Sequence, residues 1–386
     1  MIPAEHGLAV PARAGTAAVG PVPLRGSDQP LAELFDVALM DLDGVVNRGG
    51  AAVPHAADAI AEAGRRGMRT IYVTNNALRP PAEVAARLTG FGVPATADEV
   101  VTSAQAAAHV LAGRLAAGAR VLVLGGRGLR AAVLEEGLTP VDGADDGPVA
   151  VVQGFDPELT YARITEAAYA IRAGAWWVLS NADRTVPAER GIAPGNGAIA
   201  ALLRAATDRE PLVTGKPEAA MHEESMRRSD ARNPLIVGDR LDTDIEAGTR
   251  SGTPTLLVLT GVTTPSELLA ARPPHRPTYL SADLRGLLHP APAVHPAPAV
   301  HLGRDDDAHV GSCGRWRARA EAGELSWTPV TVQPAGAGTG STDGLDGLRA
   351  GCVAAWAAAD AGVPVHTIAT ERPEGCAELA APAAHL

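Results

Sequence analysis

From Leu31 onward, short apolar runs rich in Val, Ile and Leu alternate with alanine-rich stretches. The apolar runs predict buried strands, and they are VALM (37–40), TIYVTNN (70–76), VLVLGG (121–126), AVVQGF (150–155), WWVLSN (176–181), 234–238 and 255–259. The stretches 54–65, 81–88 and 103–115 predict helices, the first two with proline near the start. This alternation is typical of parallel sheets with helices on their faces, so we expect an α/β fold.

The composition changes at both ends of this pattern. Residues 1–30 are rich in Ala, Gly and Pro and predict a disordered leader. HPAPAV occurs twice within 289–300, and such a proline-rich repeat predicts a semi-rigid spacer rather than part of a packed core. Beyond the repeat, 314–330 predicts a hairpin, 347–362 a helix and 363–369 a strand. The end of the chain is therefore expected to be a small α+β appendage, without chemistry that its residues reveal.

Net charge and cysteine content limit which binding partners and which cellular compartment suit the chain. Lys and Arg number 33 against 44 Asp and Glu, a net charge of −11, which disfavours binding to nucleic acid or to an anionic membrane. The chain shows no signal peptide and nothing near the roughly 18 apolar residues of a membrane span. Cys313, Cys352 and Cys376 have no metal-ligand spacing, and their odd number argues against a disulfide framework. We expect a cytoplasmic protein.

Polar side chains follow four of the apolar runs or predicted strands. They are Asp41 and Asp43, then Thr74, Asn75 and Asn76, then Lys216, and finally Asp239, Asp242 and Asp244. Parallel strands bring such residues to one edge of a sheet, where ligands bind. Two carboxylates two residues apart repel unless a cation lies between them. Mg²⁺ prefers carboxylate, phosphate and water oxygens, so the inventory predicts a Mg²⁺ ion and a phosphoryl group at this edge.

The motifs DLDGV, VTNN, GKP and GDRLDTD, in this order, resemble the four motifs of the haloacid dehalogenase-like phosphatases. The resemblance covers 31–288. The long insertion between the second and third motifs resembles the subfamily with a large α/β cap (subfamily IIA), which includes nitrophenyl phosphatase-like and phosphoglycolate phosphatases. The resemblance implies a Rossmann-like parallel-sheet core with an inserted cap. It also implies hydrolysis of a small phosphorylated metabolite with Mg²⁺ as the cofactor.

Carried over from the family, each motif residue has an implied role. Asp41 is the implied nucleophile and Asp43 the implied general acid and base, acting through an aspartyl-phosphate. Thr74, Asn75, Asn76 and Lys216 are the implied phosphate-binding residues. Mg²⁺ would be held by Asp41, the backbone carbonyl of Asp43, and Asp239, with Asp244 in support. Asp242 has no implied role and is expected at the surface.

The changes in composition and the positions of the motifs divide the chain into five expected parts. They are a leader (1–30), a core (31–118 and 206–288), a cap (119–205), a proline-rich linker (289–302) and an appendage (303–386). The cap should supply specificity, and Asn181 and Asp183 lie in the stretch that resembles the family's substrate loop. Gly195, Asn196 and Gly197 are expected to form a helix start. Caps of this type often join in dimers, so the resemblance implies a possible homodimer.

The sequence leaves two questions open: which substrate the chain acts on, and whether it is an enzyme or a binding protein. The linker and appendage resemble an actinobacterial subgroup linked to glycerol 3-phosphate hydrolysis, with an appendage likened to part of an acetyltransferase fold. Glycerol 3-phosphate is therefore the leading substrate, and phosphoglycolate or a sugar phosphate is the alternative. In the family's pyridoxal phosphate branch a histidine precedes this proline, so Val186 before Pro187 makes this chain resemble that branch less and argues against pyridoxal phosphate. A different class is a non-catalytic regulator that binds a phosphometabolite, although binding alone needs no nucleophile.

Overall fold

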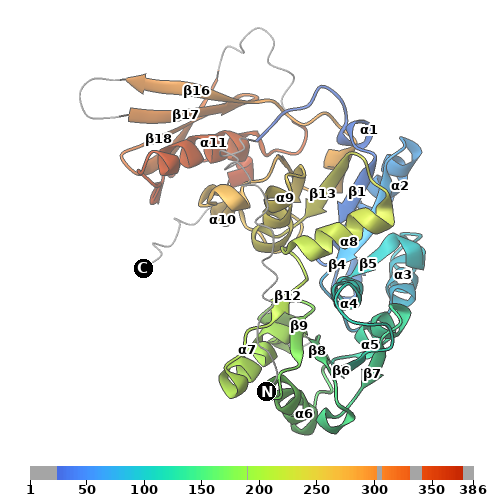
Figure 1. Cartoon of the computed structure of the whole chain (residues 1–386). Helices are drawn as coiled ribbons and strands as arrows, with labels where there is room; N and C mark the ends of the chain where they lie inside the picture. The colour runs from blue at the N-terminus through green and yellow to red at the C-terminus, as the bar shows by residue number, and fades with distance from the viewer. Residues whose placement is uncertain (1–23, 189, 302–306, 331–340, 377–386) are drawn as a thin grey trace.

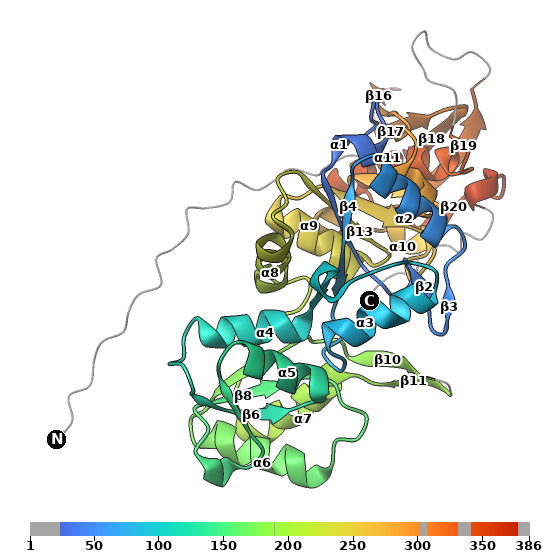
Figure 2. The same cartoon turned by 90° about the vertical axis from the view of Figure 1, so that its right-hand side faces the viewer.

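The computed structural model describes residues 24–188, 190–301, 307–330 and 341–376, and within them the chain forms three larger sheets (Figure 1). A six-stranded sheet lies in the middle. The sheet of the inserted segment lies on one side of it and the sheet of the C-terminal segment on another, an arrangement that both views show (Figure 2). No helix in the described ranges combines the length and the apolar character that crossing a bilayer requires.

The central sheet has the order β15-β14-β13-β1-β4-β5, and every neighbouring pair is parallel. Its strands are β1 (Val37–Met40), β4 (Arg69–Thr74), β5 (Val100–Thr102), β13 (Pro234–Gly238), β14 (Thr255–Val258) and β15 (Tyr279–Ser281). Strands of a parallel sheet covered on both faces read as continuous apolar runs, and β1 is buried throughout. The expected α/β core is thereby confirmed, with β1 between β13 and β4.

Alternate residues of β1 face two different layers. Ala38 and Met40 pack with α2 and α3, whereas Val37 and Leu39 pack with α4 and α8. The helices around this sheet are α1 (Leu31–Leu34), α2 (Ala56–Arg65), α3 (Pro81–Gly90), α4 (Ser103–Ala112), α8 (Ala219–Ser229), α9 (Glu246–Ser251) and α10 (Pro265–Leu269). The two layers hold the carboxyl ends of the strands in a fixed arrangement. A small hairpin, β2 (Asn47–Arg48) and β3 (Ala51–Ala52), follows β1.

The inserted segment forms a second parallel sheet in the order β12-β9-β8-β6-β7. Its strands are β6 (Arg120–Leu124), β7 (Thr139–Val141), β8 (Ala150–Gln153), β9 (Trp176–Leu179) and β12 (Leu212–Val213). Its helices are α5 (Arg127–Glu135), α6 (Tyr161–Arg172) and α7 (Asn196–Thr207). A hairpin of β10 (Thr185–Ala188) and β11 (Gly191–Pro194) leaves this sheet (Figure 2).

Two expected limits of the cap differ from the structure. Strand β12 joins the cap sheet although it lies beyond residue 205, because it pairs with β9. Helix α4, expected in the core, also packs its Ala104, Ala107 and Leu111 against the cap strands. Helix α4 therefore packs in the hydrophobic layers of both the core and the cap and connects them. A single boundary in the sequence cannot describe a helix that belongs to two domains.

The C-terminal segment forms a five-stranded sheet, β16-β17-β18-β19-β20, covered by one long helix, α11 (Asp346–Asp360). The strands are β16 (Val294–His301), β17 (Asp307–Cys313), β18 (Trp316–Glu321), β19 (Glu324–Pro329) and β20 (Thr367–Ile368). The expected hairpin and helix are present. The expected strand over 363–369 is shorter, and short single turns complete the chain: η1 (Ala97–Glu99), η2 (Ala144–Asp146), η3 (Leu241–Ile245), η4 (Pro273–His275), η5 (Leu284–Leu287) and η6 (Glu374–Cys376).

Two expectations for the ends of the core are corrected. The proline-rich repeat is not a spacer over 294–301, because it forms β16, which pairs antiparallel with β17. Proline is accepted in an edge strand, where a missing N–H need not break the ladder. The expected leader is also too long, since Leu24 is buried and the backbone N–H of Arg25 donates to Thr278 O at 2.8 Å. Residues 1–23 lie outside the described chain.

Candidate active site

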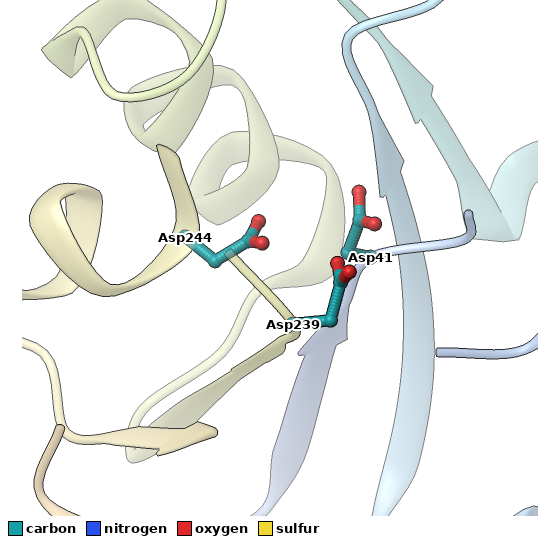
Figure 3. A group of neighbouring side chains, drawn as sticks. All are labelled: Asp41, Asp239 and Asp244. Atoms are coloured by element: carbon teal, nitrogen blue, oxygen red, sulfur yellow. The ribbon is translucent and has the colours of Figure 1, made fainter. Parts of the chain in front are cut away.

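The carboxyl ends of β1 and β13 meet in the middle of the central sheet. Asp41 directly follows β1, and its backbone N–H donates to Val237 O at 2.8 Å. Asp239 directly follows β13, and Asp244 lies in the turn η3 that comes after it. One carboxylate oxygen from each of these three residues lies within 4.8 Å of the others (Figure 3). The expected gathering of carboxylates at one sheet edge is present.

Lys216 lies in the loop after β12 and reaches this group of carboxylates. Its Nζ donates to Asp41 Oδ1, to Asp244 Oδ1 at 2.7 Å and to Val73 O at 3.1 Å. The residue is 9% exposed. Burial alone would lower the pKa of Lys216, but the charges of Asp244 and Asp41 outweigh it and raise that pKa. Lys216 is therefore a fixed cation, held from both sides by carboxylates.

Asp239 is fully buried, and its two carboxylate oxygens differ in their hydrogen bonding. Its Oδ2 accepts a hydrogen bond from the backbone N–H of Val262 at 2.6 Å, whereas its Oδ1 has no partner within the described residues. Burial, followed by the charge of Asp244, raises the pKa of Asp239 to about 6. A Cβ placed on Gly261 would lie 1.7 Å from Asp239 Oδ2, so only glycine allows this backbone to approach the carboxylate.

The charges in this group do not balance. Three carboxylates face one ammonium, and burial raises the pKa of Asp41 well above its ordinary value; the charge of Lys216 opposes this rise, and Asp244 and Asp239 add to it. A buried carboxylate oxygen without a donor is costly unless a cation approaches it. The unpartnered Asp239 Oδ1 and the all-oxygen donor set therefore suit a hard cation such as Mg²⁺.

Asp244 and Asp242 differ as expected, although they are two residues apart. Asp244 is 1% exposed and accepts from Lys216 and, through Oδ2, from the backbone N–H of Arg240 at 3.2 Å. Asp242 is exposed and pairs with the Arg240 guanidinium at 2.8 Å. Asp244 thus orients the lysine, whereas Asp242 takes part in a surface ion pair.

Asp43 lies apart from the three clustered carboxylates. Strand β1 ends at Met40, so the alternation of side chains along a strand does not extend to Asp41 and Asp43. Asp43 is exposed, and its Oδ1 accepts from Asn47 Nδ2 at 2.9 Å. It lines a small cavity with Thr74 and Asn76, next to the end of β4. This carboxyl group is consequently accessible from outside.

Thr74, the last residue of β4, and the two asparagines that follow it make different contacts. Thr74 Oγ1 accepts from the N–H of Asn76 at 3.1 Å, and Asn76 Oδ1 accepts from the N–H of Leu78 at 2.8 Å, which together fix a tight turn. Asn75 instead bonds to the backbone of Lys216, accepting from its N–H at 2.8 Å and donating to its carbonyl at 3.2 Å. The side chain of Asn75 therefore positions the lysine rather than pointing to open space.

The inserted segment contacts the core at Asn75. Asn181 is 3% exposed and donates from Nδ2 to Asn75 O at 2.8 Å, while Asn75 Nδ2 lies 3.5 Å from Asp183 Oδ2. Burial raises the pKa of Asp183, with Arg240 and Lys216 opposing the rise. Asn196, at the start of α7 as expected, donates to Asn181 O at 2.8 Å. A polar chain thus runs from α7 to Lys216.

The loop that follows β14 was not among the predicted site residues. This loop supplies the N–H of Val262 and the close approach of Gly261 to Asp239. Its signal was weak but present, since LTGV (259–262) also follows a strand of the same sheet. Ser103 was missed as well; its hydroxyl donates to Asn75 O at 2.6 Å. Contacts made through backbone groups leave no residue signature.

Three family models match separate parts of the chain. Haloacid dehalogenase-like hydrolase matches residues 38–139, and a second haloacid dehalogenase hydrolase-like model matches residues 213–287. The first contains Asp41 and the residues after β4, and the second contains Lys216, Asp239 and Asp244. A GCN5-related N-acetyltransferase-like domain matches residues 313–372, which are the appendage.

Curated relatives are similar over the same region. D-glycerol 3-phosphate phosphatase of Mycobacterium tuberculosis is 48% identical over 257 residues, which cover 67% of this chain and 72% of the relative. Acid sugar phosphatase of Staphylococcus saprophyticus is 38% identical over 256 residues, covering 66% of this chain and 97% of the relative. Both identities are high enough over enough length to show common descent.

Among solved structures, the crystal structure of glycerol phosphate phosphatase from M. tuberculosis in complex with magnesium has a TM-score of 0.76 and 40% identity, covering 89% of this chain and 96% of that one. The p-nitrophenyl phosphatase of Archaeoglobus fulgidus has a TM-score of 0.61 and 30% identity, covering 66% and 98%. The chain belongs to the haloacid dehalogenase-like hydrolases, in the branch with a large α/β cap, and is a magnesium-dependent phosphoric monoester hydrolase.

Proposed function

We propose that this phosphatase hydrolyses glycerol 3-phosphate through a phosphorylated Asp41. The observation that carries the proposal is the contact of Lys216 with Asp41 Oδ1, beside the unpartnered oxygen of Asp239. This arrangement presents one carboxylate to an incoming phosphoryl group next to a fixed positive charge. The substrate is suggested by the printed activity of the M. tuberculosis relative.

In the first step, a carboxylate oxygen of Asp41 attacks phosphorus and the bond from phosphorus to the ester oxygen breaks. Asp43 gives its proton to the departing alkoxide, which leaves as glycerol. The exposed position of Asp43, next to the end of β4, supports this role, because the leaving group must be able to reach solvent. The product on the enzyme is an aspartyl-phosphate.

In the second step, Asp43 takes a proton from water, and the resulting hydroxide attacks the phosphorus of the aspartyl-phosphate. The bond between phosphorus and the Asp41 oxygen breaks, which releases phosphate and restores the carboxylate. The same group acts first as acid and then as base, so each turnover begins with the same protonation state of Asp43.

Lys216, Thr74 and Asn76 hold the phosphoryl oxygens in this scheme. Lys216 contributes charge, and Thr74 and Asn76 contribute a hydroxyl and an amide from the fixed turn after β4. Asn75 contributes indirectly, because its side chain holds the backbone of Lys216 on both the N–H and the carbonyl. Preorganised donors of this kind stabilise the charge that develops on the transferring group.

We assign the metal position to Asp41, Asp239 and the main-chain carbonyl of Asp43, with Asp244 supporting Lys216. The unpartnered Oδ1 of the buried Asp239 supports this assignment. When bound, Mg²⁺ supplies positive charge that neutralises the carboxylates and polarises the phosphoryl oxygens.

We propose that the inserted segment, from β6 to β12, acts as a cap that determines specificity, with the six-stranded sheet as the core and the C-terminal sheet, including β16, as the appendage. Asp183 is the candidate for contact with a substrate hydroxyl, because its carboxylate lies at the junction with Asn75. Asn181 is assigned to holding the cap against the core through Asn75 O. A cap held at this point can exclude water from the reacting phosphoryl group. A sugar phosphate is the alternative substrate, suggested by the staphylococcal relative, and phosphoglycolate is another.

The experiment that tests this proposal measures phosphate release from glycerol 3-phosphate, phosphoglycolate and sugar phosphates, with Mg²⁺ and with chelator. Wild type and Asp41→Asn are compared, with Asp242→Asn as the matched surface control. We expect Mg²⁺-dependent release with the highest kcat/KM on glycerol 3-phosphate, loss of at least about 10³-fold in Asp41→Asn and no loss in the control. Tight binding without turnover would favour the non-catalytic regulator, and release that survives in Asp41→Asn would exclude this nucleophile.

We also propose a homodimer formed through the cap and a cytoplasmic location. The dimer is supported by large apolar side chains exposed on the cap, namely Leu134, Tyr161, Tyr169, Ile192 and Leu202. The location is supported by the cysteines, since Cys313, Cys352 and Cys376 are unpaired and buried. A monomeric mass in sedimentation equilibrium at micromolar concentration would reject the dimer.

A further inference from the structure

The appendage and the core share one hydrophobic cluster. Leu257 of β14, Leu280 of β15, and Leu268 and Leu269 of α10 pack together with residues of the C-terminal sheet and its helix. The appendage side of this cluster includes Trp327, Leu345, Leu348, Cys352, Ala355 and Trp356. All of these side chains are buried, so packed apolar side chains join the appendage to the core at this cluster.

Helix α11 makes two polar contacts with α10 and the segment after it. Trp356 Nε1 donates to Leu268 O in α10 at 3.0 Å. The guanidinium of Arg276 is bidentate to Asp360, at 2.7 and 2.9 Å, and lies over the ring of Trp356 at 5.3 Å. Arg276 is 3% exposed, so this ion pair is shielded from solvent on the arginine side. The position of α10 is therefore tied to the appendage.

Helix α10 is continuous with the loop that binds Asp239. The N–H of Val262 donates to Asp239 Oδ2 at 2.6 Å, and the N–H of Thr263 donates to the main-chain oxygen of Asp239 at 3.2 Å. The next residue, Thr264, caps α10, because its hydroxyl accepts from the N–H of Glu267 and its own N–H donates to the Glu267 carboxylate. A shift of α10 therefore moves the donors on Asp239.

We infer that Trp356 and Asp360 are positioning residues for the metal site, acting through α10 and the loop 261–264. The appendage thereby sets the orientation of the Asp239 carboxylate, although it contributes no atom to the site. The inference rests on the proposed role of Asp239 as a ligand of Mg²⁺. Its physical basis is that a ligand held by two backbone donors is only as well placed as the segment that carries those donors.

The test is isothermal titration of Mg²⁺ into the metal-free full-length chain. Trp356→Phe keeps an aromatic side chain, although a smaller one, and removes the N–H that reaches α10. Trp327→Phe is the matched control, because its indole N–H donates to Gly347 O at 2.8 Å and stays within the appendage. One hydrogen bond corresponds to about 2- to 10-fold in an equilibrium, so we expect the Mg²⁺ Kd to rise by about that factor in Trp356→Phe and by less than about 2-fold in Trp327→Phe.

Two further variants keep the test decisive. Asp360→Asn, which alters a partly exposed residue, should also raise the Kd, and kcat at saturating Mg²⁺ should stay within about 2-fold of wild type in all three variants. Equal shifts in Trp356→Phe and Trp327→Phe would overturn the inference, as would an unchanged Kd in Trp356→Phe and Asp360→Asn. Asp239→Asn separates the two proposals, because an unchanged Kd in that variant would instead reject Asp239 as a ligand.

Discussion

Two groups of buried charged side chains in the described part of the chain differ in the balance of their charges. At the carboxyl edge of the central sheet, Asp41, Asp239 and Asp244 surround Lys216. At the contact of appendage and core, Arg349 is 2% exposed and donates to Asp343, Ser341 and Leu280 O. The carboxyl pKa values of the two groups shift in opposite directions. Burial and like charges raise the pKa of Asp239 to about 6, whereas Arg349 outweighs burial and lowers the pKa of Asp343.

The difference separates a structural ion network from one built for a ligand. Around Arg349, the carboxylates of Asp343 and Asp346 both accept hydrogen bonds from the guanidinium, so these groups do not require another cation. Around Lys216, Asp239 Oδ1 is left without a donor. A lowered carboxyl pKa therefore marks a complete network here, and a raised one marks a position where positive charge is still to be supplied.

Removal of Arg349 should have the largest effect on folding. Arg349→Met leaves the buried carboxylate of Asp346 and the half-buried one of Asp343 without their main cation, and breaking a buried pair in this way costs about 3–5 kcal/mol. The free energy of unfolding from urea titration measures the loss. Arg317→Met, an exposed arginine of β18, is the control and should change stability by less than about 0.5 kcal/mol. Equal stability of the two variants would mean that the network around Arg349 is not structural.

Removal of Lys216 should mainly affect the rate. Lys216→Met deletes a fixed charge next to Asp41, the proposed nucleophile, and we expect kcat to fall by about 10²- to 10³-fold. Saturating Mg²⁺ should raise the unfolding temperature of this variant, because a cation can replace the missing charge and binding stabilises the folded state. The deficit of Arg349→Met relative to wild type should not change with Mg²⁺. Rescue of both variants by Mg²⁺ would erase the distinction between the two networks.

The pH dependence of Mg²⁺ binding gives a smaller and more specific test. Because the pKa of Asp239 is raised to about 6 from 3.8, the metal-free folded chain gains stability as pH falls through 6 and loses it as pH rises. Mg²⁺ needs the ionised form, so its affinity should be constant above about pH 6 and fall by up to about 10-fold per pH unit below it. Calorimetric titration between pH 5 and 8 measures this, and a flat profile would show that Asp239 stays ionised without the metal.

Most of the central fold follows from local pattern. The runs around Val37, Ile71, Leu235 and Leu256 are buried on both faces, so their apolar character alone predicts strands. The errors arise where tertiary contacts decide. Val294–His301 has the composition of a spacer and becomes a strand because β17 offers it hydrogen bonds. Leu24 is buried by contacts with distant residues, which no local pattern encodes.

The site divides in the same way. Asp41, Lys216, Asp239 and Asp244 could be brought together from sequence, because ionisable residues at strand ends are conspicuous and parallel strands end at one edge. The role of Asn75 and the loop carrying Val262 could not, since their contacts run through backbone groups. Backbone donors are common to almost all residues, so only the folded arrangement shows which ones matter.

Strand β16 has a consequence for how copies of this chain meet. It is the outer strand of the C-terminal sheet, and an outer strand ordinarily exposes a row of N–H and C=O groups that another chain can pair with. Pro296 and Pro298 lie within it and carry no N–H, so the strand has fewer donors to offer another chain. The second copy of HPAPAV, which lies within β16, thus disfavours pairing of this edge with a strand of another chain.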